Sequence, residues 1–580
     1  MLTTNYYNDF FEFGQQKINF SFFELSLPDD DPVYTLKKVM EELDFSGLLA
    51  NCSDKGRTGY NPIMMYAVVT YANMWGIRSV DCIVDLCERD HAFIWLTRGQ
   101  KPKRDAFYDF KNRKLTSDVL DDLNYQFMRR LQKEGLVTLK ELFIDGTKIE
   151  ANANRYTFVW RGSINYHLAG LLDSIDQLFE KYNSFLQEND YGTKYELGNA
   201  QMFVIEGMDK VREVIEKNRK RKLVKHKKLS NNRIIEIDNC SPLEIRKLQN
   251  KLTMIADNEG IEFVYGKGKR KPALQQLHEE LEQCGKRLME YKECFEIMGK
   301  DRNSYSKTDL EATFMRMKED HMLNGQLKPA YNVQIAVENY YIVHGYVSSD
   351  RTDYNTLIPV LEKHKNAFGN ILEEVTADSG YCSEKNLLYL KQNEISSYIK
   401  LQDHEKRKTR AYSEDISKYY NMRTGIFEDE QFYICHDGRE LRHLRTESKE
   451  QDGYTQTFEV YGCADCSGCE HKARCLYKYD AEKDAEKNKV MKINEQWEEL
   501  KERSHANIQS ERGILKRQTH SIQTEGHFGD IKENENFRRF NYRSADKVYK
   551  EFMLYAIGRN INKYHRFLYE KLRKFEGKTA

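Results

Sequence analysis

The sequence predicts an α/β fold in which the core is a mixed β-sheet interrupted by two insertions. Strand-like apolar runs alternate with helical patterns, and this alternation favours a sheet with helices packed on it. The runs are 141–150, 331–338, 341–347, 371–377 and 396–400. Long charged segments separate the first run from the second, and a cysteine-rich stretch follows the last.

Length and charge limit the possible functions. A chain of 580 residues exceeds one hydrophobic core, so two to four domains are expected. Its 91 basic and 91 acidic residues exclude a uniformly basic coat, yet basic faces occur at 217–228 and 538–574. No apolar run approaches the roughly 18 residues of a membrane span, and the first residues lack a signal-peptide pattern. We therefore expect a cytoplasmic protein.

Residues 1–138 are predicted to form a helical domain that binds DNA. Pro62 begins an apolar helix, Gly76 interrupts it, and Ser79 can cap the next helix. A basic segment follows at 101–114. Three short helices with a glycine turn are similar to a helix-turn-helix module, and an ordinary helical cap fits the same pattern.

The remaining chain is predicted to divide into a core and two insertions. The core comprises 139–155, 329–400 and 505–575. A helical insertion occupies 156–328, and a β and cysteine-rich insertion occupies 401–504. This order of strands and helices is the one that an RNase H-like core requires. In such a sheet the first and fourth strands are neighbours, so acids at their ends would lie side by side.

Three acidic residues are the candidate catalytic site: Asp145, Asp378 and Glu525. Each aspartate ends a strand-like run, and the glutamate lies on a predicted helix. Carboxylate oxygens are the ligands that Mg²⁺ prefers, and phosphoryl transfer is served by two ions about 4 Å apart. If the acids converge, the sequence predicts a site for two Mg²⁺ or Mn²⁺ ions that cuts and joins DNA.

Both aspartates also have structural interpretations. Asp145 and Gly146 stand between two β-like tetrapeptides, which is the strongest short signal for a hairpin turn. Asp378 could begin a strand-to-helix turn in which Ser383 caps the next helix. The pairing of the two strand-end acids with a later glutamate favours chemistry.

Glu525 shares a helix face with Lys532, two turns later. A solvated charged face is the plain alternative. Gly526 and Gly529 favour a functional reason, because each costs a helix about 1 kcal/mol. They would allow a strand or a nucleic-acid backbone to approach closely.

Four cysteines lie within one short segment: Cys463, Cys466, Cys469 and Cys475. Their spacing predicts a tetrahedral structural Zn²⁺ site that folds the insertion. Possible substitute ligands are Cys435, His436 and His471. A reduced cluster without metal and an iron–sulfur cluster are the alternatives, although the last interval does not fit the iron–sulfur spacing.

These motifs together resemble those of bacterial insertion-sequence transposases of the DDE type, over nearly the whole chain. The first-aspartate block is 143–160, the second is 376–381, and the glutamate block is 521–534 with 537–540. The resemblance implies the catalytic triad named above. The basic and aromatic segment 537–543 and its neighbours would contact DNA. The residues implied are Lys532, Arg538, Arg539, Arg543, His520 and Trp160.

The chain departs from the family pattern before the glutamate. Related transposases often carry Tyr and Arg where this chain has Gln518 and Ser521, and Arg where it has His520. These positions would touch DNA.

The resemblance implies a transposase that cuts the ends of its element and joins 3′-hydroxyl ends to target DNA. Its partners would be double-stranded DNA, both terminal inverted repeats and target, and a second copy of the chain assembled on that DNA. An RNase H-like nuclease without joining activity and an inactive DNA-binding relative are the alternatives.

Overall fold

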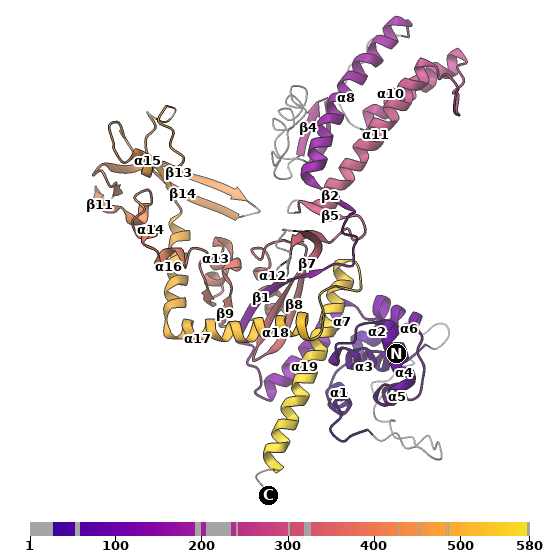
Figure 1. The fold of residues 1–580 in the computed structure, drawn as a ribbon, viewed down its shortest axis with the longest axis vertical. Helices are drawn as coiled ribbons and strands as arrows, with labels where there is room; N and C mark the ends of the chain where they lie inside the picture. Colours follow the sequence, from indigo (N-terminus) through magenta and orange to yellow (C-terminus); the bar gives the residue numbers. More distant parts are fainter. Residues whose placement is uncertain are drawn as a thin grey trace.

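The computed structural model describes most of the chain and shows a mixed α/β fold with a central sheet (Figure 1). The described residues are 27–52, 59–191, 199–204, 234–238, 242–299, 302–317, 326–428, 430–451, 454–482, 484 and 486–576. The basic run 217–228 lies outside them. None of the described helices is both long and apolar enough to cross a membrane.

The central sheet follows the predicted strand order. Its strands are β1 (Glu141–Glu150), β6 (Thr313–Arg316), β7 (Leu327–Glu338), β8 (Tyr341–Ser348), β9 (Glu374–Ala377) and β10 (Ser396–Ile399). Across the sheet they run β8-β7-β1-β9-β10, with β6 also paired to β7. Strand β7 is antiparallel to β1 and β8, whereas β9 is parallel to both β1 and β10. The predicted mixed α/β fold is confirmed, and this strand order is the one expected of an RNase H-like core.

The amino-terminal residues form helices, as predicted. These are α1 (Pro32–Glu41), α2 (Ser46–Ala50), α3 (Pro62–Met74), α4 (Val80–Arg89), α5 (His91–Thr97), α6 (Arg104–Asp109), a π-helical turn η1 (Phe110–Lys114) and α7 (Ser117–Lys133). The Asn61 side chain accepts hydrogen bonds from the first-turn N–H groups of α3, and Pro62 pre-sets its backbone. Every residue of α3 is buried, as expected for a helix that is apolar all round.

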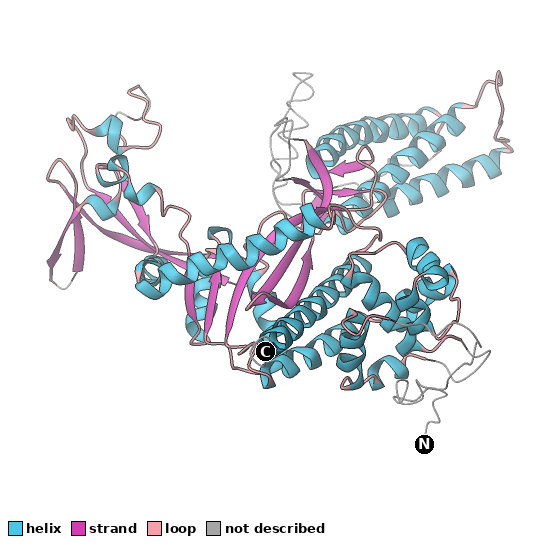
Figure 2. Cartoon of the chain, turned by 60° about the horizontal axis from the view of Figure 1, so that its bottom comes forward, coloured by secondary structure: helices cyan, strands magenta, loops and turns pink. Residues whose placement is uncertain are grey.

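Two hydrophobic clusters cover the two faces of the sheet. On one face, Ile144 and Ala336 join a cluster that includes the amino-terminal helices, α12 (Leu357–Phe368), α13 (Glu384–Gln392) and the long helix α19 (Ala545–Glu576). On the other, Ile335 packs with Phe528 and Ile531 from the segment that precedes α19. Figure 2 shows that segment as a long helix running across the strands.

The two insertions project from the sheet (Figure 1). Helices α8 (Arg161–Glu188), α10 (Pro242–Glu259) and α11 (Ala273–Met298) have a hydrophobic cluster of their own. Short strands join the base of this insertion or lie beside it: β2 (Phe158–Trp160), β5 (Ser304–Ser306), β3 (Asn199–Val204) and β4 (Ile234–Asp238). The second insertion is a five-stranded antiparallel sheet: β11 (Arg423–Phe427), β12 (Glu430–Ile434), β13 (Glu440–Gln451), β14 (Tyr454–Cys463) and β15 (Val490–Ile493). The boundaries proposed for the domains stay predictions.

Residues 495–534 do not form one continuous helix. Helix α16 (Glu495–Gln509) ends before Ser510, whose side chain caps α17 (Glu511–His520) by accepting from the Gly513 N–H at 3.0 Å. A Cβ atom at Gly513 would lie 2.7 Å from the Ile508 Cα, so this glycine permits the tight bend. Beyond α17 come the π-helical turn η5 (Ser521–Glu525), α18 (Gly526–Gly529) and a second π-helical turn, η6 (Asp530–Asn534).

Candidate active site

Asp145 lies inside a continuous strand. Strand β1 runs through both Asp145 and Gly146, so the hairpin interpretation of this pair is wrong. Asp145 pairs with Ile335 of β7, and its side chain therefore lies on the sheet face that carries the cluster around Phe528. It is 7% exposed and accepts a hydrogen bond from the Gly146 N–H at 2.7 Å.

Asp378 follows strand β9 directly. The last residue pair of the parallel β1–β9 ladder is Ile144 with Ala377. Asp145 and Asp378 each come one residue after this pair. The structure therefore places their main chains next to each other. Asp378 is exposed, and the Ser383 side chain does cap helix α13 as the alternative interpretation expects.

Glu525 ends the π-helical turn η5, which contacts β1 and β7. The neighbouring Thr524 is buried, whereas Glu525 is exposed and accepts a hydrogen bond from the Ser521 hydroxyl at 2.7 Å. The glutamate thus belongs to the helical segment that packs on the same sheet face as Asp145. Its carboxylate, however, is on the solvent-exposed side of that segment. π-Helical turns are frequent at functional sites.

The glycines next to Glu525 do not serve packing inside the chain. No described atom lies within 4 Å of a Cβ atom at Gly526 or Gly529. The expectation that a strand approaches there is therefore wrong. Approach of a nucleic-acid backbone stays a prediction.

The site has a further acid, Asp353, that the sequence reasoning missed. Asp353 Oδ1 accepts hydrogen bonds from Asn332 Nδ2 at 2.7 Å and from Gln334 Nε2 at 2.9 Å. The Tyr381 hydroxyl donates to Gln334 in turn. The signal that could have found Asp353 is its position in the loop between the β8 run and the next helix, at the edge where strand-end acids gather.

Tyr381 reports how close these acids lie. Burial raises the pKa of the Tyr381 hydroxyl well above its ordinary value, and the negative charges of Asp353, Asp145 and Asp378 raise it further. Three carboxylates therefore surround one buried phenol, and at neutral pH that phenol stays protonated as a hydrogen-bond donor.

In the described ranges, no three His, Cys, Asp or Glu side chains are grouped so that they could hold a metal ion. Asp145 and Asp378 carry carboxylate oxygens, the kind of donor that Mg²⁺ prefers. The Glu525 carboxylate instead contacts the Ser521 hydroxyl, and its part in a metal site stays a prediction.

The residues predicted to contact DNA have internal partners. Arg539 and Arg543 donate to main-chain carbonyls of Ala153 and Asn152, just after β1. Their segment also pairs with the end of β1, as Phe540 N donates to the Glu150 carbonyl at 2.9 Å. Both arginines are exposed. Each uses part of its guanidinium group to anchor the carboxyl-terminal segment to the chain just after β1.

Of the other residues predicted to contact DNA, His520 and Lys532 are buried, Trp160 is half-buried and Arg538 is exposed. His520 Nε2 donates to the Ile144 carbonyl at 3.0 Å, and Lys532 is 7% exposed. Arg538 donates to the Lys532 carbonyl at 3.1 Å. Trp160 packs edge-on against aromatic rings at the base of the helical insertion. DNA contact by these residues is untested by the structure.

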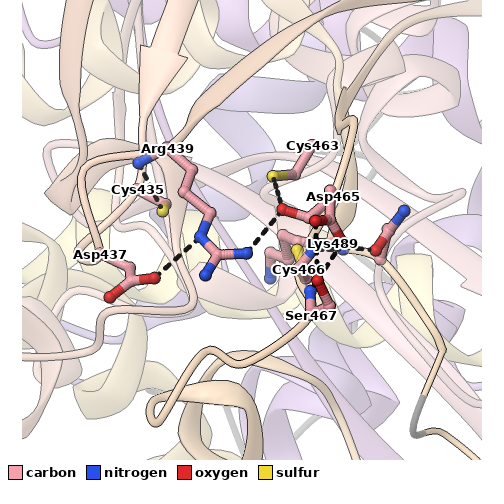
Figure 3. A network of polar contacts seen from close by, with 9 residues as sticks. Cys435, Asp437, Arg439, Cys463, Asp465, Cys466, Ser467 and Lys489 are labelled. Atoms are coloured by element: carbon pink, nitrogen blue, oxygen red, sulfur yellow. Dashed lines mark hydrogen bonds and ion pairs between the residues drawn. The ribbon is translucent and has the colours of Figure 1, made fainter.

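Cys435, a possible substitute ligand from outside the four-cysteine motif, belongs to the same network of polar contacts as Cys463 and Cys466 (Figure 3). Backbone N–H groups donate to two sulfurs: Arg439 N to Cys435 Sγ, and Lys489 N to Cys466 Sγ, both at 3.3 Å. The Cys463 thiol donates to the Asp465 carbonyl at 3.2 Å. Burial raises the pKa of Cys463 to about 11, and the neighbouring Cys466 and Cys435 contribute.

Cys469 has a different environment from the other cysteines. Burial raises its pKa, a backbone hydrogen bond at His471 lowers it, and a hydrogen bond with Asp437 raises it. Burial also raises the pKa of Cys475, and the nearby Cys435, Cys466 and Cys469 raise it further. Cys435 therefore lies near the predicted cysteines, and which four of these thiols would hold zinc stays a prediction.

Two family models match the chain. The Transposase DDE domain matches residues 434–565, and the Transposase domain (DUF772) matches residues 21–113. No curated protein and no solved structure matches it. The first match contains Glu525, whereas Asp145 and Asp378 lie outside both.

The mixed sheet with two adjacent aspartates is consistent with the RNase H-like class of α/β proteins. The two family matches show that these two segments are similar to transposase domains, in agreement with the resemblance to insertion-sequence DDE transposases.

Proposed function

We propose that this protein cuts the ends of an insertion sequence and joins the freed 3′-hydroxyl groups to target DNA. The observation that carries the proposal is the parallel pairing of Ile144 with Ala377, because it makes Asp145 and Asp378 neighbours at one edge of the sheet. The two transposase family matches support the DNA substrate.

In this proposal Asp145 and Asp378 hold divalent cations, Mg²⁺ or Mn²⁺, and Glu525 joins them after rotating away from Ser521. Two such ions, when bound, activate the attacking oxygen and stabilise the leaving oxygen. The acids would hold these ions where strand β9 ends, and Tyr381 keeps its proton beneath them. Two copies of the chain would assemble on DNA, since two element ends must be joined.

A structural Zn²⁺ ion in the second insertion is part of the proposal. Four cysteine sulfurs match the donors that tetrahedral zinc prefers, and N–H groups directed at two of them would stabilise thiolates. The thiols must lose their protons and reorient to bind, because no metal-holding group is formed among the described side chains. Its role would be to hold the loops of the insertion together.

The function is tested by incubating the protein with precut element-end DNA, a target plasmid and Mg²⁺. Joined products are expected. Hydrolysis without joining would instead indicate an RNase H-like nuclease. Binding without either reaction would indicate an inactive DNA-binding relative.

The site assignment is tested with Asp145→Asn and Asp378→Asn. Loss of a metal-binding carboxylate should lower the cutting rate by more than about a hundredfold while DNA binding is retained. Asp257→Asn, on the exposed face of α10, is the matched control and should cut normally. Cutting by Asp145→Asn at the normal rate would overturn the assignment.

A further inference from the structure

A small cavity lies where the amino-terminal helices meet helix α19. Its volume is about 20 Å³, which is room for one oxygen-sized atom. Positive side chains dominate its lining: Arg78, Lys111, Lys547 and Lys550. Glu551 is the one acidic residue among the described residues that line it. None of the three candidate catalytic acids takes part.

Two of the four cations already have anionic partners. Arg78 Nη1 lies 2.7 Å from Glu551 Oε1, and Glu551 also accepts from the Asn541 N–H at 2.9 Å. Lys550 pairs with Asp546 at 3.0 Å. The carboxylates of Glu551 and Asp546 thus already form ion pairs with Arg78 and Lys550.

Lys111 has no such partner. It is 8% exposed, and among the described residues its ammonium makes neither a hydrogen bond nor an ion pair. Its ammonium lies 5.5 Å from the centroid of the Tyr542 ring. Burial lowers the pKa of Lys111 to about 8, although the Glu551 carboxylate, already paired with Arg78, is close enough to raise it. A buried ammonium without a hydrogen-bonded anion is unfavourable, so this lysine destabilises the free protein.

The cavity reaches the surface at Lys547, which is exposed and also lacks an ion pair among the described residues. Two ammonium groups without a hydrogen-bonded anion among the described residues thus face a space with room for an oxygen-sized atom. Tyr542, a lining residue, directly follows the segment with the exposed Arg538 and Arg539.

We propose that this cavity, the Lys111 pocket, binds a non-bridging oxygen of a DNA backbone phosphate. An anionic oxygen would supply the hydrogen-bond acceptor that Lys111 lacks, while Lys547 would contact the same phosphate from the rim. Because the pocket is shared by η1 and α19, a phosphate there would tie the amino-terminal helices to the carboxyl-terminal helix. The inference rests on the proposed function in that it takes DNA as the source of the phosphate.

The first test measures DNA binding by Lys111→Met in the full chain, with Asp145→Asn added to all variants so that the probe stays uncut. The probe is a short mixed-sequence DNA duplex, and fluorescence anisotropy gives its affinity at several salt concentrations. Lys111→Met should weaken binding and make the slope of log affinity against log salt shallower by about one. Lys133→Met, which removes an exposed charge at the end of α7, is the control and should keep the slope.

The second test measures thermal unfolding without DNA. Met keeps the apolar stem of the lysine but removes the buried charge, so Lys111→Met should melt at a temperature equal to or above that of the parent. Inorganic phosphate should raise the melting temperature of the parent and leave that of Lys111→Met unchanged. Higher stability combined with weaker DNA binding is the expected signature, and a purely structural lysine would not produce it.

Unchanged DNA affinity and salt slope in Lys111→Met would overturn the inference. If phosphate still stabilised the parent in that case, the pocket would be a site for free anions; if it did not, the pocket would hold only water. Failure of the parent to bind any duplex would sink the proposed function as well, whereas normal binding by the parent and the variant alike would sink this inference alone.

Discussion

Asp353 packs against Gly146, the residue that follows Asp145 in strand β1: a Cβ atom at Gly146 would lie 2.9 Å from Asp353 Oδ1. The other carboxylate oxygen, Oδ2, would lie 3.1 Å from a Cβ atom at Gly380, two residues after Asp378. Two glycines thus let one carboxylate sit between the chain segments that carry both candidate catalytic aspartates.

Gly146→Ala should destabilise the protein. The added methyl group would collide with Gln334 and Asp353 inside the sheet, and overpacking of this kind typically costs about 1–3 kcal/mol. The free energy of unfolding, measured with denaturant, should fall by that amount. Gly526→Ala is the control: it meets no described atom within 4 Å on a helix and should be neutral or stabilising by up to about 1 kcal/mol. Equal effects of the two variants would contradict this account.

Asp353 should act as a positioning residue for the two aspartates. Asp353→Ala leaves the amides of Asn332 and Gln334 without their acceptor, which should cost about 1–3 kcal/mol of stability. It should also weaken Mn²⁺ binding, as loss of an outer support for metal ligands does by about 10–100-fold. Mn²⁺ titration followed by electron paramagnetic resonance measures this.

Asp353→Asn distinguishes positioning from direct metal binding. Its amide oxygen can still accept from Asn332 and Gln334, so stability and Mn²⁺ affinity should stay close to those of the parent. If the Asn variant loses Mn²⁺ as completely as the Ala variant, Asp353 is a metal ligand and the positioning role is wrong.

Acid should destabilise the fold through a buried histidine pair. His344 Nε2 and His364 Nδ1 are 2.9 Å apart beneath the sheet, and His364 Nε2 donates to the Leu139 carbonyl. Burial lowers the pKa of His364 to about 4 and that of His344 well below its ordinary value. Between about pH 6.5 and about pH 4 the unfolded chain binds protons that the folded chain does not, so stability falls as the pH falls.

For His364 the loss should approach about 1.4 kcal/mol for each pH unit below about 6.5. Unfolding free energies measured across this range give the slope. His364→Gln should make the slope shallower, since one of the two groups no longer titrates. His167→Gln, at an exposed histidine of α8, should leave it unchanged; a slope unaffected by His364→Gln would refute the explanation.

Zinc content should depend on Cys435 and not on Cys469. Cys435 is close enough to raise the pKa of both Cys463 and Cys475, whereas Cys469 raises that of Cys475 alone and is hydrogen-bonded to Asp437. Metal analysis of the purified protein should find about one zinc per chain for Cys469→Ser and a clear loss for Cys435→Ser. Loss of zinc in Cys469→Ser but not in Cys435→Ser would instead support the four cysteines predicted from their spacing. Absence of zinc from the parent protein would contradict the zinc hypothesis.

Local sequence pattern was sufficient for the strands of the core. The run 141–150 forms one strand, as predicted. The first and fourth strands were expected to be neighbours, and β1 does pair with β9. Alternating apolar residues and strand-end acids are local signals, and the rules of sheet connection convert them into a strand order.

Contacts between distant segments were beyond such reasoning. Spacing named Cys435 only as a possible substitute ligand, and it gave no sign that Arg543 donates to a carbonyl 391 positions earlier. The interior placement of Asp353 depends on two glycines in different strands or loops. The break at Ser510 was missed because its cause is a close approach of two helices, which no period in the sequence reveals.

Helix α19 passes so near to α3 that a Cβ atom at Gly558 would lie 2.6 Å from the Asn73 carbonyl carbon. The amino-terminal helices and the sheet thus share a single hydrophobic interior with the last helix of the chain. Exchange of residues 1–138 for those of another transposase would therefore disturb the sheet itself. The amino-terminal helices therefore cannot be grafted onto another core as a separate unit.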